Sequence, residues 1–496
     1  KAFFFCKNEL FSLFSSILFS AMIQKVFYFP QTFPIFQEAY DFFVNTKKQT
    51  ATQHLFTNKQ LRTLLVPIMV EQLLSSLMGT ADTMMVSNVG SAAISAVSLV
   101  DAINILVIQA LSALAAGGAI LCSQYLGSQN LKKAKRSAEQ VLFVMLVLSC
   151  SLSLLCLIFR FPLLRLIFGT VDTDVMANSQ IYFFFTLLSF PFIGLYDAGA
   201  SILRAQNNTK GPMTISILSN FLNIGGNAIL IFVFGMGVAG AAISTLVSRI
   251  FCAIVVIWQL RNPAEQIYVR NYFSIRPDWS LIKRVLFIGI PSGIENSMFQ
   301  FGKLAIQSTV STLGTVAIAA QAMTSILEAL NGIAAMGVGI GLMTVVGQCI
   351  GAKRKDEAIY YIKRLSWLSE IVILISCAVV YLLAKPVTIL GGMEAESARL
   401  CLQMVAFITI TKPISWVLSF IPAYGMRAAG DVKFSMITSC ASMWLCRVSL
   451  CIFLCRFCGF GPIAVWIGMF ADWSVRAVVF MLRFHSRKWL QHHVID

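Results

Sequence analysis

The chain has 496 residues, of which 57% are hydrophobic and 12% are charged, and its mean hydropathy is +0.78. Soluble domains carry about 25% charged residues, so the composition excludes a soluble protein and predicts an all-α polytopic membrane protein. The formal net charge is +16. The basic residues lie in short loops between apolar segments, which is the pattern that orients membrane proteins and not the basic face that binds nucleic acid. We therefore expect the lipid bilayer, and no nucleic acid, as a partner.

Residues 1–56 form an N-terminal extension that begins with the Phe-rich KAFFFCKNELFSLFSSILF and ends in a polar segment. It lacks a small-residue cleavage site after a clean apolar core. Three interpretations stay open: a signal sequence, an additional helix, or a true start at Met22 that leaves residues 1–21 outside the protein.

Twelve apolar stretches of about 20 residues or more follow, long enough to cross a bilayer as helices. In the first half they cover residues 61–86, 92–120, 138–159, 177–203, 212–234 and 238–260. In the second half they cover residues 282–311, 315–344, 363–384, 398–426, 434–456 and 461–483. The prediction is twelve transmembrane helices.

Basic residues are distributed unequally between the two sides of these stretches. One side, with the carboxyl-terminal tail, carries 21 lysines and arginines, whereas the other carries only Arg160, Arg165, Lys385, Arg399 and Arg456. Positive charge marks the cytoplasmic side. We therefore expect both termini in the cytoplasm of a multi-pass protein of the cell membrane.

The two halves of the chain resemble each other. PIMVEQLLSSL from Pro67 is similar to PSGIENSMFQF from Pro291, and SQYLGSQNLKKA from Ser123 is similar to GQCIGAKRKDEA from Gly347, so the shift is 291 − 67 = 347 − 123 = 224. LRAQNNTK and MRAAGDVK match with a shift of 223. Internal repeats are typical of transporters whose halves move against each other. We predict two six-helix pseudo-symmetric bundles at 57–260 and 281–484, a cytoplasmic loop at 261–280 and a tail at 485–496.

One carboxylate, Asp82, lies inside the first apolar stretch, where a charge costs about 3 kcal/mol. Its repeat counterpart is Ile306, because 82 + 224 = 306. Asn223 and Asn227 are one helical turn apart in the fifth stretch, and Thr245 follows in the sixth. Hard oxygen ligands present in one half only suit a small monovalent cation or a proton. We predict a cation-binding site formed by these four residues of the first half.

Other charged residues of the apolar stretches have two interpretations, as coupling or substrate-cavity residues or as buried counter-charges. They are Glu71, Glu295, Lys303, Glu328 and Lys412. Because unpaired charges in a bilayer are costly, we predict that Lys303 or Lys412 pairs with Glu295 or Glu328. The roles of two further acids, Asp101 and Asp197, stay open. Two arginines occupy equivalent cytoplasmic helix ends, where a cation complements the helix dipole: Arg204 and Arg427.

Several motifs resemble the multidrug and toxic compound extrusion (MATE) transporters of the MOP superfamily over about residues 57–484. They are P-x-x-x-E and A-D-T in the first stretch, QYLG with the basic residues after it, RAQNNTKGPM, and GFGPIAVWIGMFADW. In that family an Asp of span 1, two Asn or Asp residues of span 5 and a Thr of span 6 form a cation site. These match Asp82, Asn223, Asn227 and Thr245. The chain departs from NorM-like and eukaryotic members at Phe299, where they carry a glutamate.

The resemblance implies an antiporter that exports drugs or toxic organic compounds, driven by Na⁺ or H⁺ as the coupling ion and with no other cofactor. It implies small, cationic organic substrates and a monomer. A lipid-linked precursor flippase of the same superfamily is the alternative, although flippases usually add spans and a basic cavity. No metal motif, Ser–His pair or nucleotide-binding loop occurs in the sequence, so we expect no enzymatic activity.

Overall fold

A computed structural model describes residues 54–496 apart from residues 170, 273, 274, 493 and 496. The open question of residues 1–53 lies outside these described residues. Within them the regular structure is helical and no β-strand occurs. This agrees with the all-α class predicted from the composition.

The first half of the chain forms seven α-helices and one π-helical segment. They are α3 (Asn58–Ser87), α4 (Ser91–Gly127), α5 (Leu131–Ile158), α6 (Arg160–Phe168), α7 (Thr173–Ala205), α8 (Lys210–Asn227), the π-helical η2 (Ala228–Val233) and α9 (Gly237–Leu260). The helix α8 continues directly into η2, so the two form one span. The short α6 was not predicted.

The second half repeats this order, except that its described residues contain no counterpart of α6. It contains α10 (Trp279–Ser311), α11 (Thr315–Gly351), α12 (Lys355–Leu390), α13 (Ala395–Ala428), α14 (Val432–Ser442), the π-helical η4 (Met443–Val448), α15 (Ser449–Arg456), α16 (Ile463–His485) and a final 3₁₀ turn, η5 (Lys488–Gln491). The segments α14, η4 and α15 are continuous and form one span.

Each of the twelve predicted apolar stretches falls on one of these spans. Eleven of the described helices are long and apolar enough to cross a membrane. The twelfth span is α10, which has a more polar middle because it contains Glu295, Asn296, Gln300 and Lys303. Several helices extend past their apolar stretches, since hydropathy marks only the part that lies in hydrocarbon. The chain is a multi-pass membrane protein.

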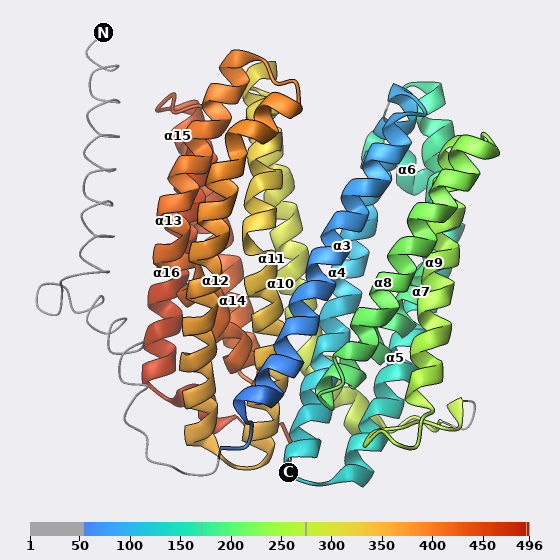
Figure 1. The fold of residues 1–496 in the computed structure, drawn as a ribbon, viewed down its shortest axis with the longest axis vertical. Helices are drawn as coiled ribbons and strands as arrows, with labels where there is room; N and C mark the ends of the chain where they lie inside the picture. Colours follow the sequence, from blue (N-terminus) through green and yellow to red (C-terminus); the bar gives the residue numbers. More distant parts are fainter. Residues whose placement is uncertain (1–53, 170, 273–274, 493, 496) are drawn as a thin grey trace, which may run out of the picture.

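The helices stand in two groups, which Figure 1 shows side by side. We call α3–α9 the N-lobe and α10–α16 the C-lobe. The groups meet at the end that carries the α4–α5, α11–α12 and α13–α14 turns, and they diverge toward the other end (Figure 1). We call the first end the basic end, because its turns carry the lysines and arginines predicted to be cytoplasmic. The helices of the two lobes therefore approach one another at the basic end and stand apart at the other end (Figure 1).

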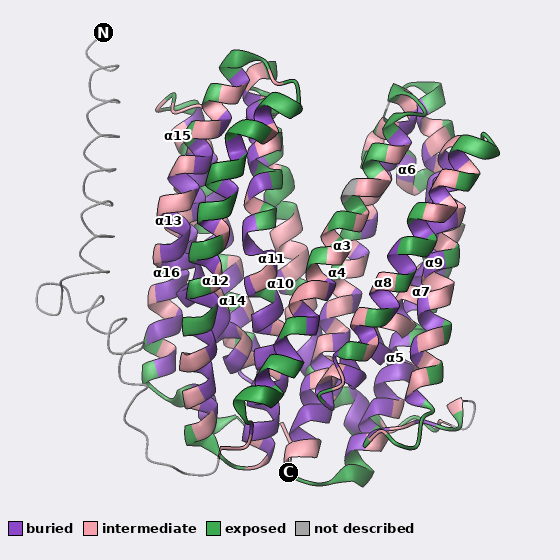
Figure 2. Ribbon diagram, in the orientation of Figure 1, coloured by how far each residue is buried: buried purple, intermediate pink, exposed green. Residues whose placement is uncertain are grey.

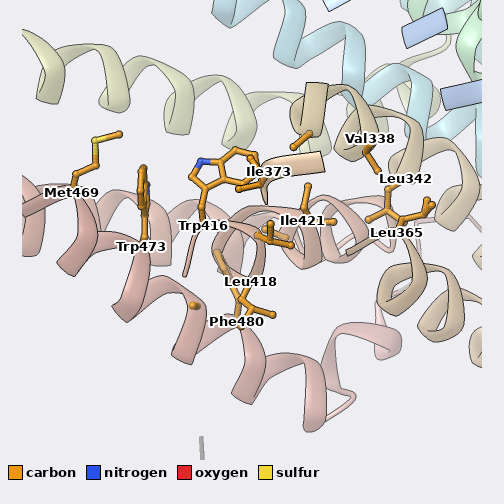
Figure 3. Close-up of a cluster of buried hydrophobic side chains, with 14 of the residues drawn as sticks. Val338, Leu342, Leu365, Ile373, Trp416, Leu418, Ile421, Met469, Trp473 and Phe480 are labelled. Carbon is orange, nitrogen blue, oxygen red and sulfur yellow. The ribbon is translucent and has the colours of Figure 1, made fainter. Parts of the chain in front are cut away.

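Two buried hydrophobic clusters form the core. One comes mostly from the C-lobe and includes the start of α3, whereas the other comes mostly from the N-lobe and includes the start of α10. Exposed residues lie on the outer faces of both groups (Figure 2). In the C-lobe, α11, α12, α13 and α16 supply the large side chains labelled in Figure 3. Trp416 and Trp473 are 4% and 2% exposed. Fully burying a large apolar side chain contributes about 1.5–3 kcal/mol, so these aromatic residues hold α13 against α16.

The lobes contact each other closely where α4 crosses α11 at the basic end. Gln124 Nε2 donates to the carbonyl of Ala428 at 2.7 Å, and Gln348 Nε2 donates to the carbonyl of Ala205 at 2.8 Å. The two glutamines are repeat mates, because 124 + 224 = 348. Each lobe thus donates one side-chain hydrogen bond to a helix end of the other lobe.

Candidate functional site

The four residues predicted to bind a cation lie together in the N-lobe. Asn227 Nδ2 donates to Asp82 Oδ1 at 2.6 Å, and Asn223 Nδ2 lies 3.4 Å from Thr245 Oγ1. Asn223 and Asn227 are 0% exposed and Thr245 is 5% exposed, whereas Asp82 is half-buried. Three helices supply these side chains: α3, α8 and α9. The cluster therefore links the first, fifth and sixth spans of the lobe.

The backbone around this cluster places its polar groups. Ser244 Oγ donates to the carbonyl of Asn223 at 2.8 Å, which fixes α9 against α8. Asn227 is the last residue of α8 before the π-helical η2, and π-helical turns are frequent at functional sites. Asn227 Oδ1 is buried and accepts no hydrogen bond from the described residues. An oxygen in that state is available as a ligand.

Charged residues beyond the four predicted ones surround Asp82, and Arg249 among them was not predicted from the sequence. The side chain of Arg249 on α9 feels the charges of Asp82, Asp101 and Asp197, and its Nη1 donates to Ser189 Oγ at 2.6 Å. A signal for Arg249 was present, because it follows Thr245 by four residues on the same helix and so shares its face.

The two acids of open role have partners in the structure. Asp101 Oδ1 accepts hydrogen bonds from Asn104 Nδ2 at 3.1 Å and from the Tyr182 hydroxyl at 3.3 Å. Asp197 Oδ2 accepts from Ser112 Oγ at 2.5 Å. Since the charge of Asp101 also acts on Asp82, the interior of the N-lobe contains several neighbouring carboxylates.

Glu71 and Glu295 form equivalent ion pairs in the two lobes. Glu71 Oε1 lies 2.6 Å from Arg204 Nη2, and Glu295 Oε1 lies 2.6 Å from Arg427 Nη2. Tyr196 also donates its hydroxyl to Glu71 at 3.1 Å. The arginines were expected only to complement helix dipoles, but each ties the fourth span of its lobe to the first. This duplication favours an architectural role for the glutamates.

A further pair joins two spans of the C-lobe. Lys412 Nζ lies 2.6 Å from Glu328 Oε1, which meets the prediction of an ion pair among these residues. Lys412 is 0% exposed, and its ammonium group lies 5.6 Å from the ring centroid of Trp416. Lys303 does not join this pair: it is exposed on α10.

The arrangement as a whole is asymmetric. The N-lobe holds a carboxylate, two amides and a hydroxyl within hydrogen-bonding distance of one another, a set that can hold a proton or ligate a small cation through oxygen. The C-lobe positions equivalent to Asp82, Asn227 and Thr245 are Ile306, Cys451 and Met469, each 224 residues later. These offer no hard oxygen ligand.

Comparison with known proteins agrees with this architecture. The sequence pattern of the MatE family matches residues 67–229 and 291–453. The two matched segments are offset by 291 − 67 = 453 − 229 = 224 residues, which is the shift of the internal repeat. The family pattern thus covers both lobes separately.

Two relatives and one solved structure illustrate the similarity. The chain is 28% identical over 432 residues to the uncharacterised transporter YisQ of Bacillus subtilis, covering 86% of this chain and 93% of the relative. It is 26% identical over 453 residues to the probable multidrug resistance protein NorM of Thermotoga maritima, covering 88% and 94%. An outward-facing multidrug resistance MATE transporter of the MOP superfamily superposes with a TM-score of 0.79 at 20% identity, over 88% of this chain and 98% of that one. With the family pattern matched in both halves, the chain belongs to the MatE family of multidrug and toxic compound extrusion transporters.

Proposed function

We propose that this transporter exports small organic compounds and that Na⁺ or H⁺ binding at Asp82 drives the export. The observation that carries the proposal is the 2.6 Å contact between Asp82 Oδ1 and Asn227 Nδ2, in a cluster that the other lobe lacks. An ion-driven transporter needs an ion-binding group whose occupancy changes which conformation the protein prefers. A carboxylate held among amides and a hydroxyl inside the bundle is suited to that role.

The two states of the site differ in the orientation of one amide. With Asp82 ionised and no cation bound, the Asn227 Nδ2 donor and the positive charge of Arg249 stabilise the carboxylate. A Na⁺ ion needs oxygen ligands instead. Rotation of the Asn227 amide exchanges its nitrogen for Oδ1, which is the buried oxygen without a hydrogen-bond donor. A proton on Asp82 would likewise remove the negative charge that holds the donor. Either ion therefore changes the contact between α3 and α8.

Movement of the two lobes is proposed because they meet at the basic end and diverge toward the other end (Figure 1). We propose that 57–260 and 281–484 move as two bodies about the basic end, where Gln124 and Gln348 bridge them. The acidic interior of the N-lobe suits a cationic substrate. The working protein is proposed to be a monomer in the plasma membrane, with both termini in the cytoplasm.

The direct test replaces the carboxylate. Asp82→Asn removes a charge from hydrocarbon, so it should leave expression and membrane insertion intact. Dye efflux from cells should lose its dependence on the ion gradient, measured with and without a protonophore and a sodium ionophore. Asp174→Asn is the matched control, because Asp174 is an exposed acid in the first turn of α7. Unchanged gradient dependence in Asp82→Asn would show that the coupling site lies elsewhere.

The flippase alternative is tested with the same variant. A lipid-linked precursor flippase would complement loss of precursor translocation and would move no soluble dye. Gradient-dependent dye efflux by the wild type, lost in Asp82→Asn, excludes precursor flipping as the main activity.

A further inference from the structure

The position in the C-lobe that corresponds to Asn223 holds an arginine. The repeat gives this equivalence, since 223 + 224 = 447, and the backbone supports it. In the N-lobe the carbonyl of Asn223 accepts a hydrogen bond from Ser244. In the C-lobe the carbonyl of Arg447 lies against Gly468, where an added Cβ would come within 2.8 Å. Because 244 + 224 = 468, the same two backbone positions meet in both lobes.

This arginine has few partners. Arg447 is 7% exposed, and its Nε atom donates no hydrogen bond to the described residues. Arg476 on α16 is 0% exposed, and none of its three guanidinium nitrogens has a hydrogen-bond partner among them. The Arg476 guanidinium instead lies 4.3 Å and 5.2 Å from the ring centroids of Phe420 and Phe299. Buried charges are costly unless they are paired, so the guanidinium donors of Arg447 and Arg476 are available to a ligand.

The acid whose charge acts most strongly on both arginines is Asp472, which is fully buried. However, its Oδ1 accepts from Ser442 at 2.6 Å. No nitrogen of either arginine is within ion-pair distance of it. The charge of Glu328 also acts on Arg447 and Lys303, and that of Glu295 acts on Arg476. Each of these glutamates is already paired with another cation, so the arginines and Lys303 keep an excess of positive charge. In contrast, Lys412 and Arg427 of the same lobe each have a glutamate at 2.6 Å.

Lys303 adds an exposed cation that interacts electrostatically with Arg447. Asn296 on α10 faces the N-lobe, because its Nδ2 donates to the carbonyl of Gln109 at 3.2 Å. Lys303 follows seven residues later, about two turns further and within about 20° of the same face. Its charge acts on Arg447, and the neighbouring Gly302 packs against Met443 of η4. The ammonium group is therefore placed on the side of the C-lobe that faces the other lobe.

We infer that Arg447 and Lys303 form a binding site for a carboxylate or phosphate group on the transported compound, and that Arg476 adds positive charge to this site. Guanidinium and ammonium groups in a partly buried setting favour these anions. The acidic cluster of the N-lobe lies in the opposite half, so the two lobes present charges of opposite sign. A zwitterionic organic compound, with a cationic and an anionic end, matches both. This inference rests on the proposed export function and specifies its substrate class.

The test measures equilibrium binding, so it requires no ion gradient. The full chain in phosphatidylcholine nanodiscs is titrated against two fluorescent probes, a rhodamine with a free carboxylate and its ethyl ester, and fluorescence anisotropy is recorded. The probes share one cationic ring and differ in the anionic group. The wild type should bind the acid about tenfold more tightly than the ester, as expected for one hydrogen bond between charged groups.

Substitutions at the site should remove this preference selectively. Arg447→Gln should reduce affinity for the acid about tenfold and leave the ester unchanged, whereas Arg447→Lys keeps the charge and should retain most of the preference. Lys303→Gln should weaken the acid in the same direction, and since Lys303 is exposed its removal does not threaten folding. Arg399→Gln is the control, because Arg399 is an exposed cation near the start of α13. Equal binding of acid and ester by the wild type would overturn the inference. So would an equal loss in Arg447→Gln and Arg447→Lys, or no effect of Lys303→Gln.

Two further arms separate the remaining outcomes. In nanodiscs containing phosphatidylglycerol the affinity for the acid probe should be unchanged. If this lipid competes with the probe, the inference of a soluble substrate is wrong and the site binds a lipid headgroup. Asp82→Asn should keep the preference for the acid. If the wild type shows this preference while its own efflux has no gradient dependence, the export proposal fails and the anion site stands.

Discussion

A single methyl group added where the lobes touch should shift the equilibrium between the conformations that are closed and open at the basic end. Gly351, the last residue of α11, lies against α4 at the basic end. A Cβ at this position would be 1.9 Å from the carbonyl oxygen of Gln124, whereas an ordinary contact is 3.4–4 Å. The clashing atom is a backbone carbonyl oxygen near the end of α4, which cannot rotate aside as a side chain can. Gly351→Ala therefore requires the lobes to separate at this point.

The size of the effect follows from this overlap. Inserting extra methylene volume into a packed contact costs about 1–3 kcal/mol. Alanine also favours the helix over glycine by about 0.5–1 kcal/mol, but that gain applies whether the basic end is closed or open and cancels in the comparison. The population open at the basic end should therefore rise by about 5–150-fold.

A thiol buried at the same crossing reports this population. Ser123 is 0% exposed, and an added Cβ at Gly347 would lie 2.9 Å from its Cβ. In Ser123→Cys the new thiol is reached by a water-soluble maleimide only when α4 and α11 separate, so its labelling rate follows the open population. The same protein without Ser123→Cys supplies the rate of the native cysteines, which is subtracted. Gly351→Ala should raise the corrected rate by the factor given above.

Two further variants give this experiment its controls. Gly127→Ala should act in the same direction, because its Cβ would be 2.0 Å from the carbonyl oxygen of Gln348. Gly293→Ala should have no effect, since the nearest atom to its Cβ is 3.7 Å away. The reasoning is refuted if Gly351→Ala folds and labels at the parent rate, or if Gly293→Ala accelerates labelling equally.

Three other predictions concern stability and coupling. Glu71→Gln should lower the stability of the detergent-purified protein, measured by thermal unfolding, by about 3 kcal/mol because it leaves Arg204 unpaired. Adding Arg204→Met should restore part of this loss. Full additivity of the two changes would show that Glu71 and Arg204 do not interact. Lys412→Met should destabilise by about 3–5 kcal/mol by the same measurement, and Glu328→Gln in the Lys412→Met background should recover some of it, whereas a further loss would not fit. Thr245→Val should reduce the ion sensitivity of dye efflux and Thr245→Ser should retain it, since only the hydroxyl is required; the same loss in both would assign the role to packing.

Hydropathy was sufficient to predict most of the membrane spans. The sixth apolar stretch, 238–260, differs by one residue from α9, because a helix in hydrocarbon must be apolar along nearly its whole length. The short α6 had no such signal. It contains Arg160, Arg165 and a proline, which are typical of a loop. The helix is stabilised by Leu164, which is completely buried against the other helices of the N-lobe. The π-helical segments were also missed, since their residues continue the apolar pattern of the α-helix.

The candidate site was predicted in part. The repeat identified Asp82 and its partners as residues present in one half only, and the structure brings these side chains together. The sequence alone did not show which sides of the helices pack against each other. It therefore could not assign Arg204 to Glu71, 133 residues away, nor place Arg249 beside the carboxylates of the N-lobe.

The π-helical segment Met443–Val448 records an event in the history of the chain. Before it, buried serines match across the repeat at a shift of 223, since 439 − 216 = 442 − 219 = 223; after it, Arg447 and Gly468 match Asn223 and Ser244 at 224. The second copy therefore gained one residue within this stretch, and a π turn holds one residue more than an α turn. The bulge absorbs the insertion locally, so that Ser442 on one side and Arg447 on the other both lie against α16. After duplication, one lobe could thus change length without losing its packing. Deleting Trp444 should return this span to an uninterrupted α-helix.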